Sequence, residues 1–326
     1  MSKLVTIYGG SGFVGRYIAQ QLAERGWRIR VAVRRPNEAL FVKPYGVVGQ
    51  VEPILCNIRD DASVAAAMQG ADAVVNCVGT FDAGGKNNFD AVQDKGAERV
   101  AEAAAAAGVK TLVHLSALGI DRDEESRYAA SKRAGEEAIL KHFPSAMILR
   151  PSVVFGPEDG FFNRFASMSR LGPVMPMFGA KTLFQPVYVE DVAAAAVKGV
   201  EGEASGIYEL GGPEVKPLRG WINEILSVVK RRRLVLNQPF WIGKVMAWFL
   251  DVGSMATGGL VRNSILTRDQ IKQLQVDNVV SEGAKGFADL GIEPIAPEVI
   301  IPSYLWRYRP NGQYDAIRDS AKNLRA

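Results

Sequence analysis

The chain has 326 residues, of which 48% are hydrophobic and 23% are charged, with a formal net charge of +4. This is an ordinary globular composition, sufficient for one large domain or for a large and a small one. Only two cysteines and two histidines occur, without the spacing of a zinc site, so we expect reduced, packed thiols and no metal. No apolar run reaches the roughly 20 residues of a membrane span and no signal-like segment precedes the first strand, so we expect neither an integral membrane protein nor a secreted one.

Strand-like and helix-like segments alternate over residues 1–150. This alternation predicts a parallel sheet covered by helices on both faces, a Rossmann-type doubly wound α/β fold. Alanine-rich 101–107 is a strong helix former, and Gly108 is its stop. The expected strands are 3–8, 28–33, 51–56, 72–77, 110–115 and 145–150, and the expected helices are 13–25, 61–69, 88–107 and 127–142.

The pattern loosens after Pro151, where prolines punctuate short segments. We expect a core over 1–160 with returning segments about 183–214, a smaller mixed α/β lobe over 161–301, and an extended C-terminal arm with a short helix over 302–326. Charge is uneven, because residues 1–215 hold 23 basic and 25 acidic side chains whereas 216–326 hold 16 and 10. The basic excess predicts an anionic partner for the last third, either a membrane surface or an acidic protein face. No motif of a nucleic-acid-binding protein accompanies it, so we expect no nucleic acid partner.

A glycine-rich segment follows directly on the first apolar strand. Gly9, Gly12 and Gly15 are spaced three apart, within Gly9-Gly10-Ser11-Gly12-Phe13-Val14-Gly15, and a helical pattern comes next. Glycines let the backbone turn tightly and approach a pyrophosphate, and the amides at a helix N-terminus receive its charge. The segment predicts a dinucleotide site; the alternative is a tight strand-to-helix turn without a ligand.

Three further segments fall at the ends of expected strands. Arg34 and Arg35 stand where sites that prefer NAD carry an acidic residue, so they favour a 2′-phosphate and hence NADP(H), unless they form a solvated loop pair. The segment 57–60, with Asn57 and Ile58, is placed to touch an adenine. A small turn formed by Cys77, Val78 and Gly79 lets the backbone approach the ribose on the nicotinamide side.

Tyr128 and Lys132 lie four residues apart and therefore share one face of the expected helix. An ammonium beside a phenol lowers the pKa of the phenol, which can then act as an acid or base near neutral pH. The same lysine can hydrogen-bond a ribose.

The glycine spacing together with Tyr128 and Lys132 resembles the extended and atypical short-chain dehydrogenase/reductase superfamily, over about residues 3–215. The segment 150–157, with Pro151, Ser152 and Val153, is similar to the strand and loop that line the nicotinamide side in that superfamily. The segment 186–193 is similar to another of its motifs.

Two departures from the superfamily concern catalysis. Active members usually carry a hydroxyl residue where this chain has Leu118, which leaves Ser116 as the only hydroxyl nearby, and Asn57 replaces a more usual aspartate. The resemblance therefore implies a complete cofactor site and a weakened catalytic trio of Ser116, Tyr128 and Lys132.

The C-terminal half is similar to the nucleotide-binding accessory subunits of respiratory complex I, the proton-pumping NADH:ubiquinone oxidoreductase. The similarity rests on ordered segments at 184–192, 266–274, 277–280, 290–292 and 301–309, and it covers essentially the whole chain. The resemblance implies a permanently held, structural NADPH, partners among the other complex I subunits, and a place on the peripheral arm near the membrane and the quinone site.

Two C-terminal stretches fit such docking. Residues 240–251 form an amphipathic aromatic pattern shortly after the basic cluster 230–233, suited to an anionic lipid surface or a partner, or else to a core helix with a solvated charge run. The aromatic and basic stretch 306–326 predicts docking on a partner.

The first hypothesis is thus a non-catalytic accessory subunit that stabilises this complex, peripheral on the cytoplasmic face of a bacterial inner membrane, or on the matrix side if mitochondrial. The alternatives are an NADPH-dependent reductase or epimerase, in which Tyr128 is the acid or base, Lys132 lowers its pKa and Ser116 is the carbonyl donor, and a regulator that senses NADP(H).

Overall fold

The structure, a computed structural model, describes residues 2–80, 84–122, 126–243, 272–315, 317–318 and 320, and divides into two compact units. The first unit comprises Met1–Ser152, Val189–Gly211 and Val280–Pro294. The second comprises Val153–Tyr188, Gly212–Val279 and Ile295–Ala326. Among the described residues, no helix is both long enough and apolar enough to cross a membrane.

The first unit is built on a seven-stranded, wholly parallel sheet in the order β11-β6-β5-β4-β1-β2-β3. The first six strands begin and end within two residues of the predicted bounds, so the predicted Rossmann-type fold is confirmed. The strands are β1 Leu4–Tyr8, β2 Arg28–Val33, β3 Val51–Leu55, β4 Ala73–Asn76, β5 Thr111–Leu115, β6 Met147–Pro151 and β11 Gly206–Leu210.

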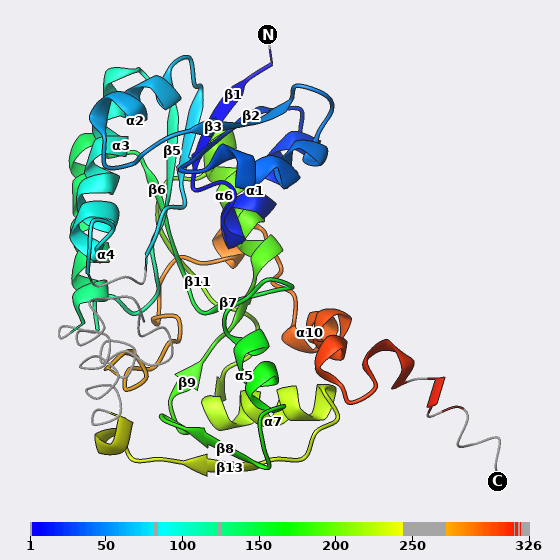
Figure 1. The fold of residues 1–326 in the computed structure, drawn as a ribbon. Coiled ribbons are helices and arrows are strands. Elements are labelled where there is room, and N and C mark those ends of the chain that lie inside the picture. The colour runs from blue at the N-terminus through cyan, green and yellow to red at the C-terminus, as the bar shows by residue number, and fades with distance from the viewer. Residues whose placement is uncertain are drawn as a thin grey trace. The chain divides into compact units, whose positions relative to one another are not determined.

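Helices cover both faces of this sheet, with α2, α3 and α4 on one face and α1 and α6 on the other (Figure 1). The predicted helices are found, with one refinement: the expected helix 88–107 begins with a π-helical turn, η2, before α3. Gly108 ends α3 in the left-handed conformation, with φ +66°. The helices are α1 Phe13–Glu24, α2 Asp61–Met68, η2 Asp90–Asp94, α3 Lys95–Ala106, α4 Arg127–His142 and α6 Val189–Glu201, with the 3-10 helices η1 Pro36–Tyr45 and η3 Ala288–Leu290.

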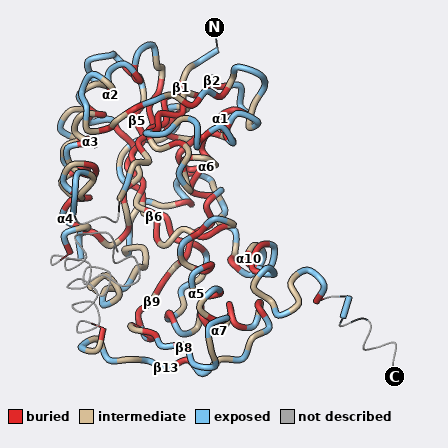
Figure 2. Tube along the Cα trace, in the orientation of Figure 1, coloured by how far each residue is buried: buried red, intermediate tan, exposed pale blue. Residues whose placement is uncertain are grey.

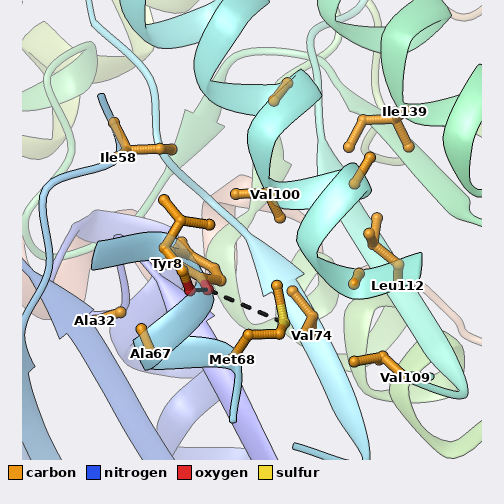
Figure 3. Close-up of a cluster of buried hydrophobic side chains, with 14 of the residues drawn as sticks. Tyr8, Ala32, Ile58, Ala67, Met68, Val74, Val100, Val109, Leu112 and Ile139 are labelled. Atoms are coloured by element: carbon orange, nitrogen blue, oxygen red, sulfur yellow. Dashed lines mark hydrogen bonds between the residues drawn. The ribbon is translucent and has the colours of Figure 1, made fainter. Parts of the chain in front are cut away.

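The core of the first unit lies between the sheet and its helices, where Figure 2 colours many residues of the strands and of the inner helix faces as buried. Tyr8 is almost fully buried, and its hydroxyl donates to the carbonyl of Val64 (2.7 Å) and contacts the Met68 sulfur (4.0 Å), as Figure 3 shows for the second contact. Burial raises the pKa of this phenol, so it stays neutral. The small side chains of Ala97 and Ala101 let α3 pack closely on this cluster.

The segment Val280–Pro294 belongs to the first unit, although it falls inside the range expected for the smaller lobe. The strand β11 is an edge strand, whose backbone groups need partners. The amide of Glu209 donates to the carbonyl of Lys285 (2.8 Å), and the amide of Ser281 donates to the Glu209 carboxylate (2.7 Å). Pairing of this edge explains why the chain returns here.

The second unit combines three two-stranded pairs with short helices around an aromatic core. Trp221 is fully buried, its indole donates to the carbonyl of Phe184 (3.1 Å), and it packs on Phe162. The elements are β7 Val154–Phe155, α5 Phe162–Met168, β8 Val174–Met177, β9 Leu183–Phe184, β10 Val187–Tyr188, β12 Lys216–Pro217, α7 Leu218–Val228, β13 Leu234–Asn237, α10 Pro297–Leu305, η4 Trp306–Tyr308 and η5 Gly312–Tyr314.

The expected arm from residue 302 is in part helical, because α10 begins earlier, at Pro297, and continues into η4. The Tyr304 hydroxyl donates to the buried Asp159 carboxylate (2.7 Å), and Arg307 donates to the Asn163 side chain (2.6 Å). Several polar groups of the arm therefore bind their own unit. Most of the amphipathic stretch 240–251, and the segment 266–271, lie outside the described residues.

Candidate functional site

A cleft opens at the carboxyl edge of the sheet, where the strand order reverses between β1 and β4. The chain leaves β1 toward β2 on one side, while β4 pairs with β1 on the other. Ligands of open parallel sheets bind at such a switch point, because the two loops that leave it part in opposite directions. The lining residues are Tyr8, Gly9, Ser11, Gly12, Ala32, Val33, Arg34, Cys56, Asn57, Ile58, Cys77, Val78, Gly79, Thr80, Asn87 and Val92.

The glycine loop connects β1 to α1 along one wall of this cleft. Gly9 has φ +76°, and its amide donates to the carbonyl of Ala32 (3.0 Å), which ties the loop to β2. Gly12 caps α1 without a side-chain hydrogen bond, so the first amides of the helix remain available to an anion. A Cβ on Gly15 would lie 2.5 Å from the Gly9 carbonyl oxygen, so only glycine lets the helix approach the loop this closely.

The two consecutive arginines after β2 separate in the structure. Arg34 is exposed and lines the cleft, where its guanidinium can meet a phosphate. Arg35 does not line the cleft and pairs with Glu38 (3.0 Å) on the exposed surface. The exposed side chains of this ion pair make its contribution to stability small.

The residues after β3 serve two purposes: some line the cleft and one caps the next helix. Asn57 and Ile58 line the cleft, and the Asn57 side chain accepts a hydrogen bond from the Arg59 amide (3.2 Å), which holds the turn. Asp60 caps α2 instead, since its carboxylate accepts from the Ser63 amide (2.7 Å).

The turn after β4 forms the opposite wall. The amide of Val78 donates to the Asn76 side chain (3.1 Å), and the Asn76 amide group in turn contacts the His114 ring (3.2 Å). Burial raises the pKa of the Cys77 thiol to about 12, so it lines the cleft as a neutral thiol. A Cβ on Gly79 would lie 3.8 Å from the Lys132 ammonium, which places that lysine directly behind the wall.

Lys132 projects from α4 and is buried, with its ammonium donating to the carbonyl of Leu115 (2.9 Å). Burial lowers its pKa to about 8, although the charge of Glu136 opposes the shift. Tyr128, one turn earlier, is half-buried, with its ring edge-on to Phe89.

The hydroxyl expected in active reductases is replaced by a buried Leu118, whose amide donates to the carbonyl of Pro151 (2.9 Å). Ser116 is buried too, and among the described residues its hydroxyl has no hydrogen-bond partner. A buried polar atom without a partner is energetically costly, so this hydroxyl needs an explanation beyond packing.

Some predicted site residues do not line this cleft. Gly10 and Gly15 allow close packing of the loop, because a Cβ at either position would meet neighbouring atoms. Ser152 is buried just after β6, and its backbone amide donates to the carbonyl of Leu210 (2.8 Å). Val153 belongs to the second unit, where its amide binds the Asn278 side chain (3.1 Å). The others that do not line it are Phe13, Val14, Arg35, Ser116, Tyr128, Lys132 and Pro151.

Several lining residues were not singled out from the sequence. Tyr8, Ala32, Val33 and Cys56 stand at the carboxyl ends of consecutive parallel strands, a signal that the strand prediction already contained. Asn87 and Val92 come from the segment before α3, and no local pattern marks them.

A doubly wound parallel sheet with a glycine loop at its switch point defines the class of dinucleotide-binding Rossmann domains. The chain belongs to the NAD dependent epimerase/dehydratase family, which matches residues 5–211.

Relatives extend the similarity beyond that segment. Over 95% of this chain and 79% of the relative, it is 33% identical to the mitochondrial NADH dehydrogenase [ubiquinone] 1 alpha subcomplex subunit 9 of Arabidopsis thaliana. It is 32% identical to the mitochondrial NADH-ubiquinone oxidoreductase 40 kDa subunit of Neurospora crassa, over 98% of this chain and 83% of the relative. A ceramide reductase of Caulobacter vibrioides is 34% identical over 64% of each chain.

Among solved structures, an NADPH-dependent quinone oxidoreductase of Escherichia coli, complexed with NADPH, has a TM-score of 0.69 at 17% identity. The match covers 92% of this chain and 98% of that one. At this identity the likeness shows the fold alone.

Proposed function

We propose that this chain is a nucleotide-holding accessory subunit of a membrane-bound NADH:quinone oxidoreductase of the complex I type. The observation that carries the proposal is the extent of the similarity: the two mitochondrial subunits match 95% and 98% of the chain, hence both units. The epimerase/dehydratase family matches only residues 5–211, whereas the similarity to these subunits also takes in the C-terminal part of the chain. Its location is then peripheral, on the side of the membrane that faces the cytoplasm or the matrix.

The cleft supports a nicotinamide dinucleotide as the bound group. The loop from Gly9 to Gly12 and the first amides of α1 would receive its pyrophosphate, and Asn57 and Ile58 would flank its adenine. Arg34 lines the cleft, and a guanidinium there would pair with a 2′-phosphate, which supports NADPH as the preferred nucleotide. When bound, such a nucleotide supplies a hydride; here we propose that it is held as a structural element.

Two features support a non-catalytic role. Leu118 occupies the position of the usual hydroxyl, and it is buried. Lys132 donates to the backbone at Leu115, which anchors α4 on β5. A nucleotide can be held without catalysis as long as α4 and the walls of the cleft keep their positions.

The test is to solubilise the source membranes gently, separate the complexes by size, and locate this chain. We expect it to co-migrate with NADH:quinone oxidoreductase activity in a very large assembly and to release NADPH, identified by mass spectrometry, only on denaturation. A chain that migrates alone in every mild detergent, while the oxidoreductase stays intact, rules the proposal out.

A second function, an NADPH-dependent reductase, is favoured by the ceramide reductase relative and by the presence of Tyr128 and Lys132. In that case Tyr128 would hold the proton that a reduced carbonyl oxygen receives, and Ser116 would donate a hydrogen bond. The purified chain would then consume NADPH with a carbonyl substrate, and Tyr128→Phe would abolish turnover without loss of bound nucleotide. Absence of turnover across a panel of ceramide-like and quinone substrates counts against it.

A further inference from the structure

The strands β8 and β13 of the second unit form a small parallel ribbon, seen at the foot of Figure 1. Side chains alternate between the two faces of a strand. Met175, Met177 and Val235 point to the buried face and join the core of the unit. The other face carries Val174, Pro176, Leu234 and Leu236, which we call the ribbon face.

The ribbon face is exposed and apolar, the reverse of the polar outer face that a sheet open to water normally shows. Leu234 is 59% exposed and its register partner Val174 is 45% exposed. Leu171, in the turn before β8, is 86% exposed, and Trp241, shortly after β13, is 65% exposed. The four residues of the ribbon face are neighbours by register, and monomeric proteins seldom expose a contiguous apolar patch unless something binds it.

The segments that carry the ribbon are strongly basic. Residues 169–177 and 228–243 contain Arg170, Lys230, Arg231, Arg232 and Arg233 and no acidic residue. In the described part of the chain, Lys230 pairs with Asp315 (2.9 Å), whereas none of the four arginines forms an ion pair with a carboxylate. The positive charge beside the ribbon is therefore largely uncompensated.

Hydrogen bonds hold two of these arginines in place. The Nε of Arg233 donates to the carbonyl of Ser169 (2.6 Å), just after α5, and the Nε of Arg231 donates to the carbonyl of Tyr308 (2.9 Å), at the end of η4. Binding carbonyls at helix ends is a structural task. Arg233 also donates from one Nη to the carbonyl of Arg232 (2.8 Å), so these bonds use one of the five N–H donors of Arg231 and two of those of Arg233. The remaining donors can bind an anion. Burial lowers the pKa of Arg231, and the charges of Arg233 and Arg170 lower it further. Arg170, Arg231 and Arg233 therefore lie near one another.

We propose that the ribbon face and these arginines bind the surface of an anionic phospholipid membrane. Apolar side chains beside fixed cations match the two layers of such a surface, the upper acyl region and the phosphate headgroups. The inference deepens the proposed peripheral location and rests on it for the source of the lipid, but the isolated chain suffices to test it. The sequence predicts that 240–251, beside the basic cluster 230–233, contacts an anionic lipid surface or a partner, or else forms a core helix; the structure adds the ribbon itself.

The test is co-sedimentation of the purified chain with phosphatidylcholine vesicles and with vesicles that also contain phosphatidylglycerol. We expect binding to the anionic vesicles to be at least about tenfold tighter, since each basic residue near the surface contributes roughly fivefold, and to weaken as salt is raised. Val174→Glu with Leu234→Glu should lower this binding about tenfold or more, because two charges would have to enter the interface. Arg232→Glu, at an exposed side chain, should lower it about fivefold or more.

The matched control is Val47→Glu with Val48→Glu in the first unit, where the two valines are 75% and 105% exposed. It changes the net charge equally and should leave vesicle binding unchanged; all variants should keep the wild-type circular dichroism and unfolding midpoint. Equal binding to neutral and anionic vesicles, or wild-type binding by the ribbon variant, overturns the inference even if the chain co-migrates with the oxidoreductase. Vesicle binding by a chain that never co-migrates supports the ribbon face and overturns the proposed function. Failure of the wild-type chain to bind, with co-migration lost in the ribbon variant, assigns the face to a protein partner and overturns the lipid proposal.

Discussion

At the scale of single residues, residues that are close in the sequence have different roles in the folded chain. Arg34 lines the cleft whereas Arg35 turns outward to Glu38, although both follow the same strand. In the glycine loop, Gly12 lines the cleft, while Gly15 serves the close packing of α1 on the loop. A change at each position therefore tests a different property.

Replacing Arg34 and Arg35 one at a time should separate the effect of the cleft arginine on nucleotide preference from the effect of a change in surface charge. Arg34→Asp should lower the preference for NADP(H) over NAD(H) by about tenfold or more, because a charge-assisted hydrogen bond to the 2′-phosphate is lost. Arg35→Asp makes the same change of charge outside the cleft and should alter the preference by less than about twofold. Nucleotide affinities by calorimetry measure both, and equal effects would show that the phosphate is bound elsewhere.

Gly15→Ala should destabilise the first unit by about 1–3 kcal/mol and weaken nucleotide binding, because the added Cβ meets the Gly9 oxygen at 2.5 Å and the Gly10 Cα at 2.8 Å. These are backbone atoms, so the loop itself must shift. Gly84→Ala is the control, since a Cβ there has nothing within 4 Å. Denaturant unfolding with and without nucleotide reports both effects, and a Gly15→Ala chain as stable as the control would refute the close approach.

At the scale of elements, the segment from Cys56 to Asp60 shows how one loop serves both a site and a helix. Its first half lines the cleft, and its last residue caps α2. The Ser63 hydroxyl accepts a hydrogen bond from the backbone amide of Asn57 (3.0 Å), so the loop is also fixed to the first turn of the helix. The sequence assigned the whole segment to adenine contact, whereas the structure assigns Asp60 to the helix.

Loss of this cap should cost stability without changing the cleft directly. Asp60→Ala removes the acceptor for the Ser63 amide and should lower the unfolding free energy by about 1 kcal/mol. Asp60→Asn keeps an acceptor oxygen and should lose distinctly less. Urea denaturation compares the two, and a loss of equal size in both variants would mean that charge rather than the hydrogen bond stabilises the helix.

At the scale of the whole molecule, the parallel sheet forces polar groups into the interior of the first unit. His114 lies on β5, an interior strand of the sheet, is 1% exposed, and faces the Asn76 amide. Burial, with a smaller contribution from the charge of Lys132, lowers its pKa from 6.5 to about 3. A neutral histidine in the core makes the stability of this unit depend on pH.

The sign follows from where the proton binds. Below pH 6.5 the unfolded chain binds a proton at this residue and the folded chain does not, so the unfolding free energy falls as pH falls toward 3. The slope reaches at most about 1.4 kcal/mol per pH unit. His114→Asn keeps an acceptor and cannot titrate, so it should flatten the curve above about pH 5, where carboxylates remain ionised. An unchanged slope in the variant would show that other groups cause it.

Local pattern was sufficient for the first six strands, the helices between them and the glycine loop. Each carries its own signal: apolar runs for β1 and β4, an alanine-rich face for α3, and Gly108 as a stop. Neighbouring parallel strands end at one edge, so Gly9, Arg34, Asn57 and Cys77 could be brought together from the order of elements alone.

Only the tertiary structure decided the rest, because those features depend on contacts between residues far apart in the chain. The return of Val280–Pro294 to the edge of β11, the outward turn of Arg35 and the cleft position of Asn87 leave no local pattern. The strands β8 and β13 were not predicted from the sequence, and only their pairing shows that one apolar face of this ribbon lies toward water. Sequence periodicity determines which elements form, whereas long-range packing determines which of their faces are left for a ligand or a membrane.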